Sequence, residues 1–160
     1  MPDMLVKLYE LPPAGPIIEA LAAQGSTIRR AIPPEKHKVV AWVQQEFGSR
    51  WASECDVAFA HHPVGCFVAV RESAEGQKEI LGFGCHDATC KNFFGPTGVK
   101  ESERGKGIGK ALLLSCLHAM RELGYAYAII GGAGPTDFYA KVVSATVIEG
   151  SVPGIYRGMI

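Results

Sequence analysis

Residues 99–110 read Val-Lys-Glu-Ser-Glu-Arg-Gly-Lys-Gly-Ile-Gly-Lys and lie between an apolar stretch and a segment of helical period. Glycines stand at the alternate positions 105, 107 and 109. Because glycine has no Cβ atom, backbone N–H groups there can approach a ligand closely and point in one direction. The dipole of the helix that follows adds about half a positive charge at this end. The stretch therefore predicts a turn that binds a phosphate or pyrophosphate group.

Basic side chains gather around this turn, although the chain as a whole is neutral. Its 160 residues contain 16 Lys+Arg and 16 Asp+Glu, a net charge of 0. This balance argues against binding of nucleic acid or of an anionic membrane through the overall field. From Lys100 to Glu122 there are five basic and three acidic residues, a local surplus of 5 − 3 = 2 positive charges. The surplus favours an anionic ligand at the turn itself.

Two familiar phosphate-binding motifs do not fit the turn. A Walker A loop requires G-x-x-x-x-G-K-[ST], but Arg104 stands at its first glycine and Ala111 at its Ser/Thr position. A dinucleotide-binding fingerprint requires G-x-G-x-x-G/A, but Lys110 or Leu112 stands at its last position. The turn therefore lacks the residues on which each of these two motifs depends.

The remaining sequence predicts one α/β domain over residues 1–160, without repeats or a dividing linker. Pro96, between Gly95 and Gly98, suggests a bulge in the strand before the glycine turn. We expect helices at 13–23, 33–47, 50–60, 107–123 and 137–142, and strands at 4–11, 66–71, 80–89, 93–100, 125–130, 145–149 and 155–160.

The cysteines and the hydropathy pattern indicate a cytoplasmic protein. Cysteines stand at positions 55, 66, 85, 90 and 116 and form no Cys-x-x-Cys pair. We therefore expect free thiols in a reducing compartment, with neither a disulfide framework nor a metal site. No stretch approaches the ~18 consecutive apolar residues of a transmembrane helix, and the first residues do not resemble a signal peptide.

Four features in this order resemble the GCN5-related N-acetyltransferase (GNAT) family. They are the R-x-x-G-x-G motif from Arg104 to Gly109, the hydrophobic V-x-x-x-x-R-G start at Val99, the apolar strand after the helix, and Phe138-Tyr-Ala-Lys141, which is similar to the family's F-Y-x-K segment. The order of elements is similar over essentially the whole chain. One departure is Val142-Val-Ser-Ala145, where the family often has Gly-Phe.

The resemblance implies an α/β sandwich of the GNAT type, with a mixed, mostly antiparallel sheet flanked by helices. The strand–helix–strand unit of residues 93–130 would carry the cofactor turn. The implied activity is transfer of an acetyl group from acetyl-CoA, without a metal, to a primary amine of a small molecule or peptide by direct attack in a ternary complex. The residues expected to bind the cofactor are Val99, Lys100, Glu101, Arg104, Gly105, Lys106, Gly107, Ile108, Gly109, Lys110 and Tyr139.

The resemblance also suggests which groups move protons. Tyr139 is the expected proton donor to the departing thiolate, and a phenol with a pKa near 10 suits that role. For the general base, a tight turn at 90–92 would pair positions that sum to about 183. That register puts His86 and Asp87 beside the expected acyl position. Glu101 and Glu54 are further candidates, and a chain of waters would serve as well.

Two other functions are compatible with the sequence. The first is an acyl-CoA-binding or sensing domain that has kept the turn and lost catalysis. The second is a phosphate-binding regulatory module unrelated to CoA. No charge cluster names the acceptor, and the apolar C-terminal residues could pair two copies of the chain as a homodimer.

Overall fold

A computed structural model describes residues 1–160 as a seven-stranded sheet with helices on both faces. The strand order is β2-β3-β4-β5-β6-β1-β7. The strands are β1 (Met4–Lys7), β2 (Ser26–Arg30), β3 (Cys66–Glu72), β4 (Lys78–His86), β5 (Phe93–Val99), β6 (Tyr127–Ile130) and β7 (Thr146–Val147). The helices are α1 (Gly15–Ala23), α2 (Lys36–Phe47), α3 (Ser49–Ala58), α4 (Ile108–Glu122) and α5 (Thr136–Val143). Short 3₁₀ turns cover Leu8–Glu10, Pro33–Glu35, Glu101–Glu103 and Gly154–Tyr156.

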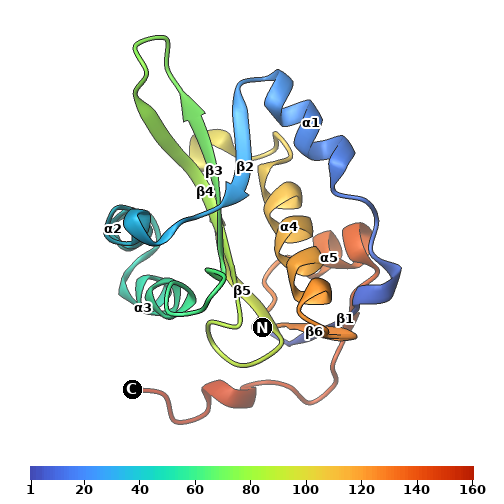
Figure 1. The fold of residues 1–160 in the computed structure, drawn as a ribbon. Helices are drawn as coiled ribbons and strands as arrows, with labels where there is room; N and C mark the ends of the chain where they lie inside the picture. Colours follow the sequence, from blue (N-terminus) through green and yellow to red (C-terminus); the bar gives the residue numbers. More distant parts are fainter.

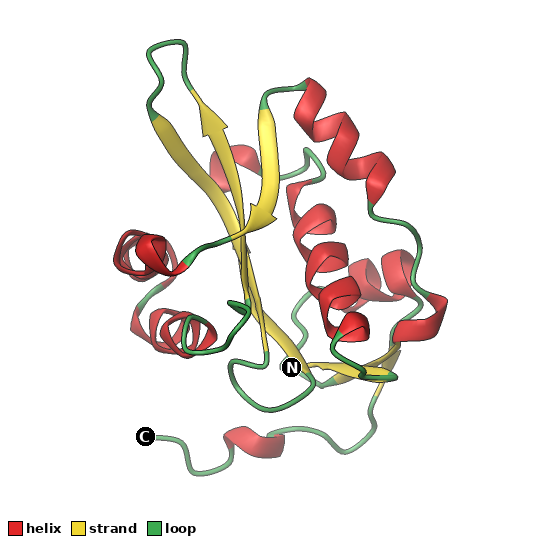
Figure 2. Ribbon diagram, viewed as in Figure 1, coloured by secondary structure: helices red, strands yellow, loops and turns green.

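Figure 1 shows α2 and α3 on one side of the sheet and α1, α4 and α5 on the other, and Figure 2 shows the same layers by type of element. A buried apolar cluster joins α2 and α3 to β3 and β4. Two further clusters lie on the opposite face, where α4 packs against the sheet, α1 and α5. Because it is covered on several sides, α4 buries ten of its 15 residues. None of the helices is both long and apolar enough to cross a membrane.

The sheet is antiparallel except between β5 and β6, and this exception shapes the molecule. These two strands run parallel but pair only at Phe93 with Ile129 and at Phe94 with Ile130. Because β6 ends at Ile130, residues Gly95 to Val99 of β5 have no paired strand on that side. We call this unpaired side of β5 the fork; it is closed at Phe94 and open toward the glycine turn.

The structure corrects the expected elements at both edges of the sheet. Ser26–Arg30 forms a strand that the sequence did not predict. This polar run is extended only because it pairs with β3 at the edge of the sheet. The expected strand at 155–160 is wrong. The N-terminal β1 lies between β6 and β7 and occupies the available pairing positions there. Glycines 150, 154 and 158 have positive φ angles, which interrupt an extended chain.

The expected register between β4 and β5 is also wrong. Gly98 pairs with Phe83 and Thr97 with Gly84, and an irregularity then brings Phe94 opposite His86. The difference arises because residues 87–92 connect these strands, a longer loop than the tight turn at 90–92 that the sequence suggested. Pro96 lies in the irregular stretch, as its flanking glycines predicted. His86 therefore lies at the closed end of the fork instead of beside Thr97.

Candidate functional site

The glycine turn leads directly into α4 and leaves the first backbone donors of this helix without a side-chain cap. Gly105 and Gly107 have φ angles of 78° and 94°, which favour glycine. Gly107 is also confined by packing, because a Cβ atom there would lie 2.8 Å from Cδ1 of Ile17. The turn thus presents backbone N–H groups and a helix N-terminus, the arrangement that suits an anion.

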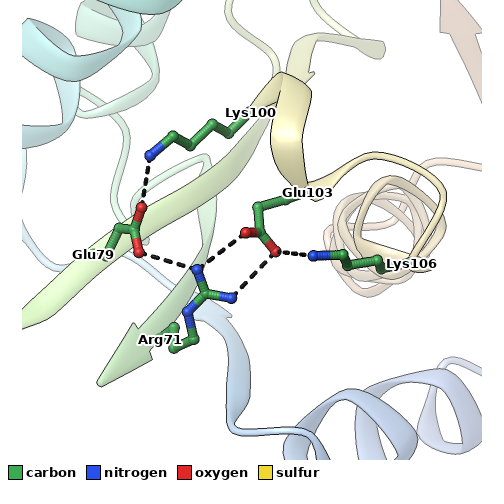
Figure 3. Close-up of polar contacts among 5 residues, drawn as sticks. All are labelled: Arg71, Glu79, Lys100, Glu103 and Lys106. Atoms are coloured by element: carbon green, nitrogen blue, oxygen red, sulfur yellow. Dashed lines mark hydrogen bonds and ion pairs between the residues drawn. The ribbon is translucent and has the colours of Figure 1, made fainter. Parts of the chain in front are cut away.

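Five charged side chains brace this turn against the ends of β3 and β4 (Figure 3). The buried carboxylate of Glu103 accepts hydrogen bonds from Nη1 and Nη2 of Arg71 at 3.2 and 3.0 Å, and from Nζ of Lys106 at 3.0 Å. Arg71 also donates to Glu79 at 3.1 Å, and Lys100 donates to the same carboxylate at 2.7 Å. Hydrogen bonds from Arg71, and then from Lys106, lower the pKa of Glu103. The network therefore stays ionised at neutral pH.

This network changes the roles open to the basic residues of the turn. Lys100 and Lys106 are directed at carboxylates, so their charges are largely balanced within the protein. Arg104 forms no ion pair, and its Nε donates to the carbonyl oxygen of Val99 at 3.3 Å. Lys110, in the first turn of α4, also has no carboxylate partner. Arg104 and Lys110 are therefore the side-chain cations left for an anionic ligand.

The backbone of β5 is directed into the open part of the fork. Val99 lies opposite Gly82, and the N–H of the next residue, Lys100, donates to the carbonyl oxygen of Leu81 at 2.8 Å. Alternate residues of a strand direct their backbone groups to opposite sides. The N–H of Val99 therefore points away from β4 and toward the gap beside β6. An extended ligand arm could pair there as an added strand does.

Tyr139 lies at the closed end of the fork, on the face covered by α4. Its ring packs edge-on against Phe94 at 6.4 Å between centroids and against Phe138 at 5.2 Å. The residue is only 6% exposed, and its hydroxyl makes no hydrogen bond within the chain. Burial raises the pKa of Tyr139, so the phenol is protonated at neutral pH and can act as a donor. The structure thus brings together the expected glycine turn, the backbone of Val99 and Tyr139 around one fork.

His86 and Asp87 lie in the protein interior. Nδ1 of His86 is 2.9 Å from Oδ2 of Asp87, whose Oδ1 accepts hydrogen bonds from the hydroxyl of Tyr125 at 2.8 Å and from the N–H of Asn92 at 2.9 Å. Nε2 of His86 is buried without a partner, and burial lowers the pKa of this histidine. His86 faces Phe94 instead of Thr97, so the register predicted for the pair is not found. Glu101 is exposed, in the short 3₁₀ turn before the glycines.

Tyr156 reaches the fork from a segment that sequence reasoning had assigned to a strand. Its hydroxyl lies 3.0 Å from the position that a Cβ atom of Gly131 would take, directly after β6. Thr89 and Glu54 lie nearby and are joined by a hydrogen bond of 2.5 Å. These residues come from the C-terminal segment, the β4–β5 loop and α3, so no local motif could have identified them together.

Comparison with known proteins finds solved structures of similar fold. The fold is similar to a GCN5-related glucosamine N-acetyltransferase region of a fungal multi-domain GH3 β-N-acetylglucosaminidase, with a TM-score of 0.72, 16% identity, and coverage of 92% of this chain and 19% of that one. It is also similar to a GCN5-related N-acetyltransferase from Sphaerobacter thermophilus, with a TM-score of 0.68, 24% identity, and coverage of 92% and 48%.

The chain therefore spans between about a fifth and a half of the length of these solved proteins. No curated protein matches it. The family model described as the acetyltransferase (GNAT) family matches residues 36–141, which include α2, the fork, the glycine turn and most of α5. The chain belongs to the acetyltransferase (GNAT) family.

Proposed function

We propose that the protein is an acetyl-CoA-dependent N-acetyltransferase that transfers the acetyl group to a primary amine of a small molecule or peptide. The observation that carries this proposal is the fork between β5 and β6, which opens toward the uncapped N-terminus of α4. A backbone N–H at Val99 and a phenol at Tyr139 lie along that fork. The fold, the family and the chemistry of these groups all support the same reaction.

The residues present fit acetyl-CoA, which supplies an activated acetyl thioester. The backbone donors of the glycine turn, the dipole of α4, and the free cations Arg104 and Lys110 would hold the pyrophosphate. The outward N–H groups of β5 would pair with the pantetheine arm. The proposed cofactor residues remain Val99, Lys100, Glu101, Arg104, Gly105, Lys106, Gly107, Ile108, Gly109, Lys110 and Tyr139. Among them, Lys100 and Lys106 would act mainly by bracing the turn through Glu79 and Glu103.

Two groups of this chain would assist the transfer. The Val99 N–H would donate to the carbonyl oxygen of the thioester, on which negative charge develops as the amine attacks. Tyr139 would donate its phenolic proton to the departing sulfur. Both groups are held by the sheet and by buried packing before any ligand binds, so little reorganisation is required.

The same proposal extends to the partners and the compartment. The acceptor is a primary amine, and the zero net charge does not support nucleic acid or an anionic membrane as a partner. All five cysteines are free, in keeping with the reducing cytoplasm in which we place the reaction. A homodimer would require the exposed apolar C-terminal residues to pair with a second copy.

Thermal unfolding with acetyl-CoA, CoA, ATP or no ligand tests the proposed cofactor. A ligand at about 100 times its Kd adds about 2.7 kcal/mol to the free energy of unfolding. For a domain of this size the midpoint should rise by roughly 5–11 °C. We expect this shift with acetyl-CoA and CoA and little shift with ATP.

An equal response to ATP would instead support a phosphate-binding regulatory module, and no response to any of the three at millimolar concentration would contradict the proposal. Thiol release from acetyl-CoA in the presence of primary amines then separates an enzyme from a domain that only binds or senses acyl-CoA. The enzyme releases thiol and forms an acetylated amine, whereas the sensor shows the thermal shift alone.

A further inference from the structure

Three buried cysteines meet on the face of the sheet that carries α2 and α3 (Figure 1). They are Cys55 of α3, Cys66 of β3 and Cys85 of β4, and their Sγ atoms all lie within 4.8 Å of one another. The spacing of the cysteines in the sequence indicated no metal site, because that reading depends on ligands that are close together in the chain. The fold instead brings together three thiols from separate elements.

The sheet holds two of these thiols side by side. Cys66 and Cys85 lie directly opposite each other in the antiparallel pair of β3 and β4. Directly opposed residues place their Cβ atoms about 4.5–5.5 Å apart on one face of a sheet. Both cysteines belong to the apolar cluster that contains Ala52, Cys55 and Ala58, so the face they share is the one packed against α3.

Gly65 fixes the position of the third thiol relative to this pair. Its N–H donates to the carbonyl oxygen of Ala58, the last residue of α3, at 2.9 Å, and its own carbonyl oxygen accepts the N–H of His86 at 2.9 Å. A Cβ atom at position 65 would lie 2.8 Å from the carbonyl oxygen of His86, so this close approach requires glycine. The backbone of Gly65 therefore joins the end of α3, the start of β3 and the end of β4, which carry the three cysteines.

Apolar side chains enclose the thiols. Each of the three cysteines has 0% of its surface exposed. The buried residues of the same cluster are valines, alanines and phenylalanines, among them Val43, Val68 and Phe83. No histidine, carboxylate or fourth cysteine completes the group. An ion held between these sulfur atoms would therefore have three ligands from the protein and no position open to solvent.

The number and type of ligands select the ion. Thiolates favour soft ions, of which Cu(I) and Zn²⁺ are the common examples. Structural Zn²⁺ is almost always bound by four ligands in a tetrahedron, whereas Cu(I) is stable with three thiolates in a plane. With metal–sulfur distances of about 2.3 Å, such a plane places the sulfur atoms about 4.0 Å apart. The observed separations, within 4.8 Å, accommodate this arrangement with only small shifts.

We propose that Cys55, Cys66 and Cys85 form a closed structural site for one Cu(I) ion. Each ligating thiol releases its proton to solvent as the metal–sulfur bond forms, and copper stays in the same oxidation state. The ion cross-links α3 to β3 and β4, so it stabilises the fold and takes no part in acetyl transfer. None of the three cysteines belongs to the glycine turn or the fork, so this inference does not depend on the proposed function.

Refolding with copper tests the site, because buried thiols are accessible to an ion while the chain folds. The full chain would be refolded under nitrogen with Cu(I), and its affinity measured by competition with bicinchoninate, which forms a coloured Cu(I) complex. All proteins would carry Cys90→Ala, since Cys90 is an exposed thiol that can bind copper by itself. We expect this background protein to retain one Cu(I) per chain, and the further changes Cys55→Ala and Cys85→Ala each to weaken binding more than about 100-fold. Loss of a direct ligand should exceed the 10- to 100-fold cost typical of an outer partner.

Cys116→Ala is the matched control. Cys116 is equally buried but belongs to the α4 cluster on the other face of the sheet, so its replacement should leave copper affinity unchanged. Bound Cu(I) should also raise the unfolding midpoint of the background protein and of Cys116→Ala by about 5 °C or more, but not that of Cys55→Ala.

X-ray absorption of the copper-loaded background protein tests the site without a change to its ligands, and so decides the matter even where an alanine variant fails to refold. We expect three sulfur atoms at about 2.3 Å and no nitrogen or oxygen ligand. Fewer than three sulfurs, equal copper affinity in Cys55→Ala and Cys116→Ala, or retention of Zn²⁺ as tightly as Cu(I) would overturn the inference. The thermal shift with acetyl-CoA, measured on the same proteins, reports on the proposed function separately.

Discussion

Replacement of Gly105 by alanine separates the effect of the glycine turn on folding from its effect on ligand binding. Gly105 has a φ angle of 78°, and a Cβ atom there would meet no atom within 4 Å. Gly124, just after the C-terminal end of α4, has a φ angle of 100° and an equally open surrounding. Because the left-handed region costs a non-glycine residue about 1 kcal/mol, each Gly→Ala change should lower the unfolding midpoint by about 2–4 °C.

Binding should distinguish these two variants. At Gly105 the added methyl group would lie among the N–H groups proposed to hold the pyrophosphate, whereas Gly124 is at the other end of α4. The loss of one hydrogen bond to a charged group costs about 1.5–3 kcal/mol. This loss corresponds to acetyl-CoA binding that is roughly 10- to 150-fold weaker.

Isothermal titration calorimetry would measure the affinity of each variant for acetyl-CoA. Thermal unfolding without ligand would measure the loss of stability expected in both variants. We expect Gly105→Ala and Gly124→Ala to unfold at similar temperatures, while only Gly105→Ala loses affinity. Equal affinity of the two variants would refute the placement of the pyrophosphate on this turn. A much larger loss of stability for Gly105→Ala would show that the free-space argument at this position is wrong.

Two further predictions concern buried titratable groups. Tyr139→Phe should lower kcat for acetyl transfer at least about tenfold and leave the Kd of CoA nearly unchanged, because the packing remains and only the proposed proton donor is lost. Tyr9→Phe, at an exposed position, is the control. Normal turnover of Tyr139→Phe would contradict the assignment of Tyr139 as proton donor. Burial lowers the pKa of His86, so below about pH 6.5 the unfolded chain binds a proton that the folded chain does not. The free energy of unfolding should therefore fall as pH drops from about 7.5 to 5.5, and urea titrations should show a smaller fall for His86→Gln.

The sequence predicts well the parts of the fold that depend on residues close together in the chain. The glycines at 105 and 107 have positive φ angles in the structure, and the apolar pattern that follows them becomes the buried helix α4. The parts it misses depend on distant partners. Ser26–Arg30 is polar and becomes a strand only because β3 offers it an edge. The expected strand at 155–160 does not form because the N-terminal β1 pairs with both β6 and β7.

The same distinction applies to the candidate site. The glycine turn and Tyr139 belong to local motifs, so their positions could be predicted from the sequence. The register of β4 and β5 depends on a six-residue loop anchored by Asp87, and this loop moves His86 away from its expected neighbour. Glu54 and Thr89, which share a hydrogen bond, and Tyr156, whose hydroxyl lies beside Gly131, come from distant parts of the chain. No spacing in the sequence indicates these positions.

The pairing of charges around the turn shows why summed charge is a poor guide to how the turn could hold a phosphate group. The sequence counts Lys100 and Lys106 as attractive charges, but the fold places Glu79 and Glu103 against them. Arg71 joins these carboxylates, so the lysines hold the backbone of the turn in place (Figure 3). Recognition of an anion at this turn then depends mainly on directed N–H groups and the helix dipole. Substitution of Gly105 therefore tests the site more directly than removal of Lys106, whose loss would also take one hydrogen bond from the buried Glu103 carboxylate.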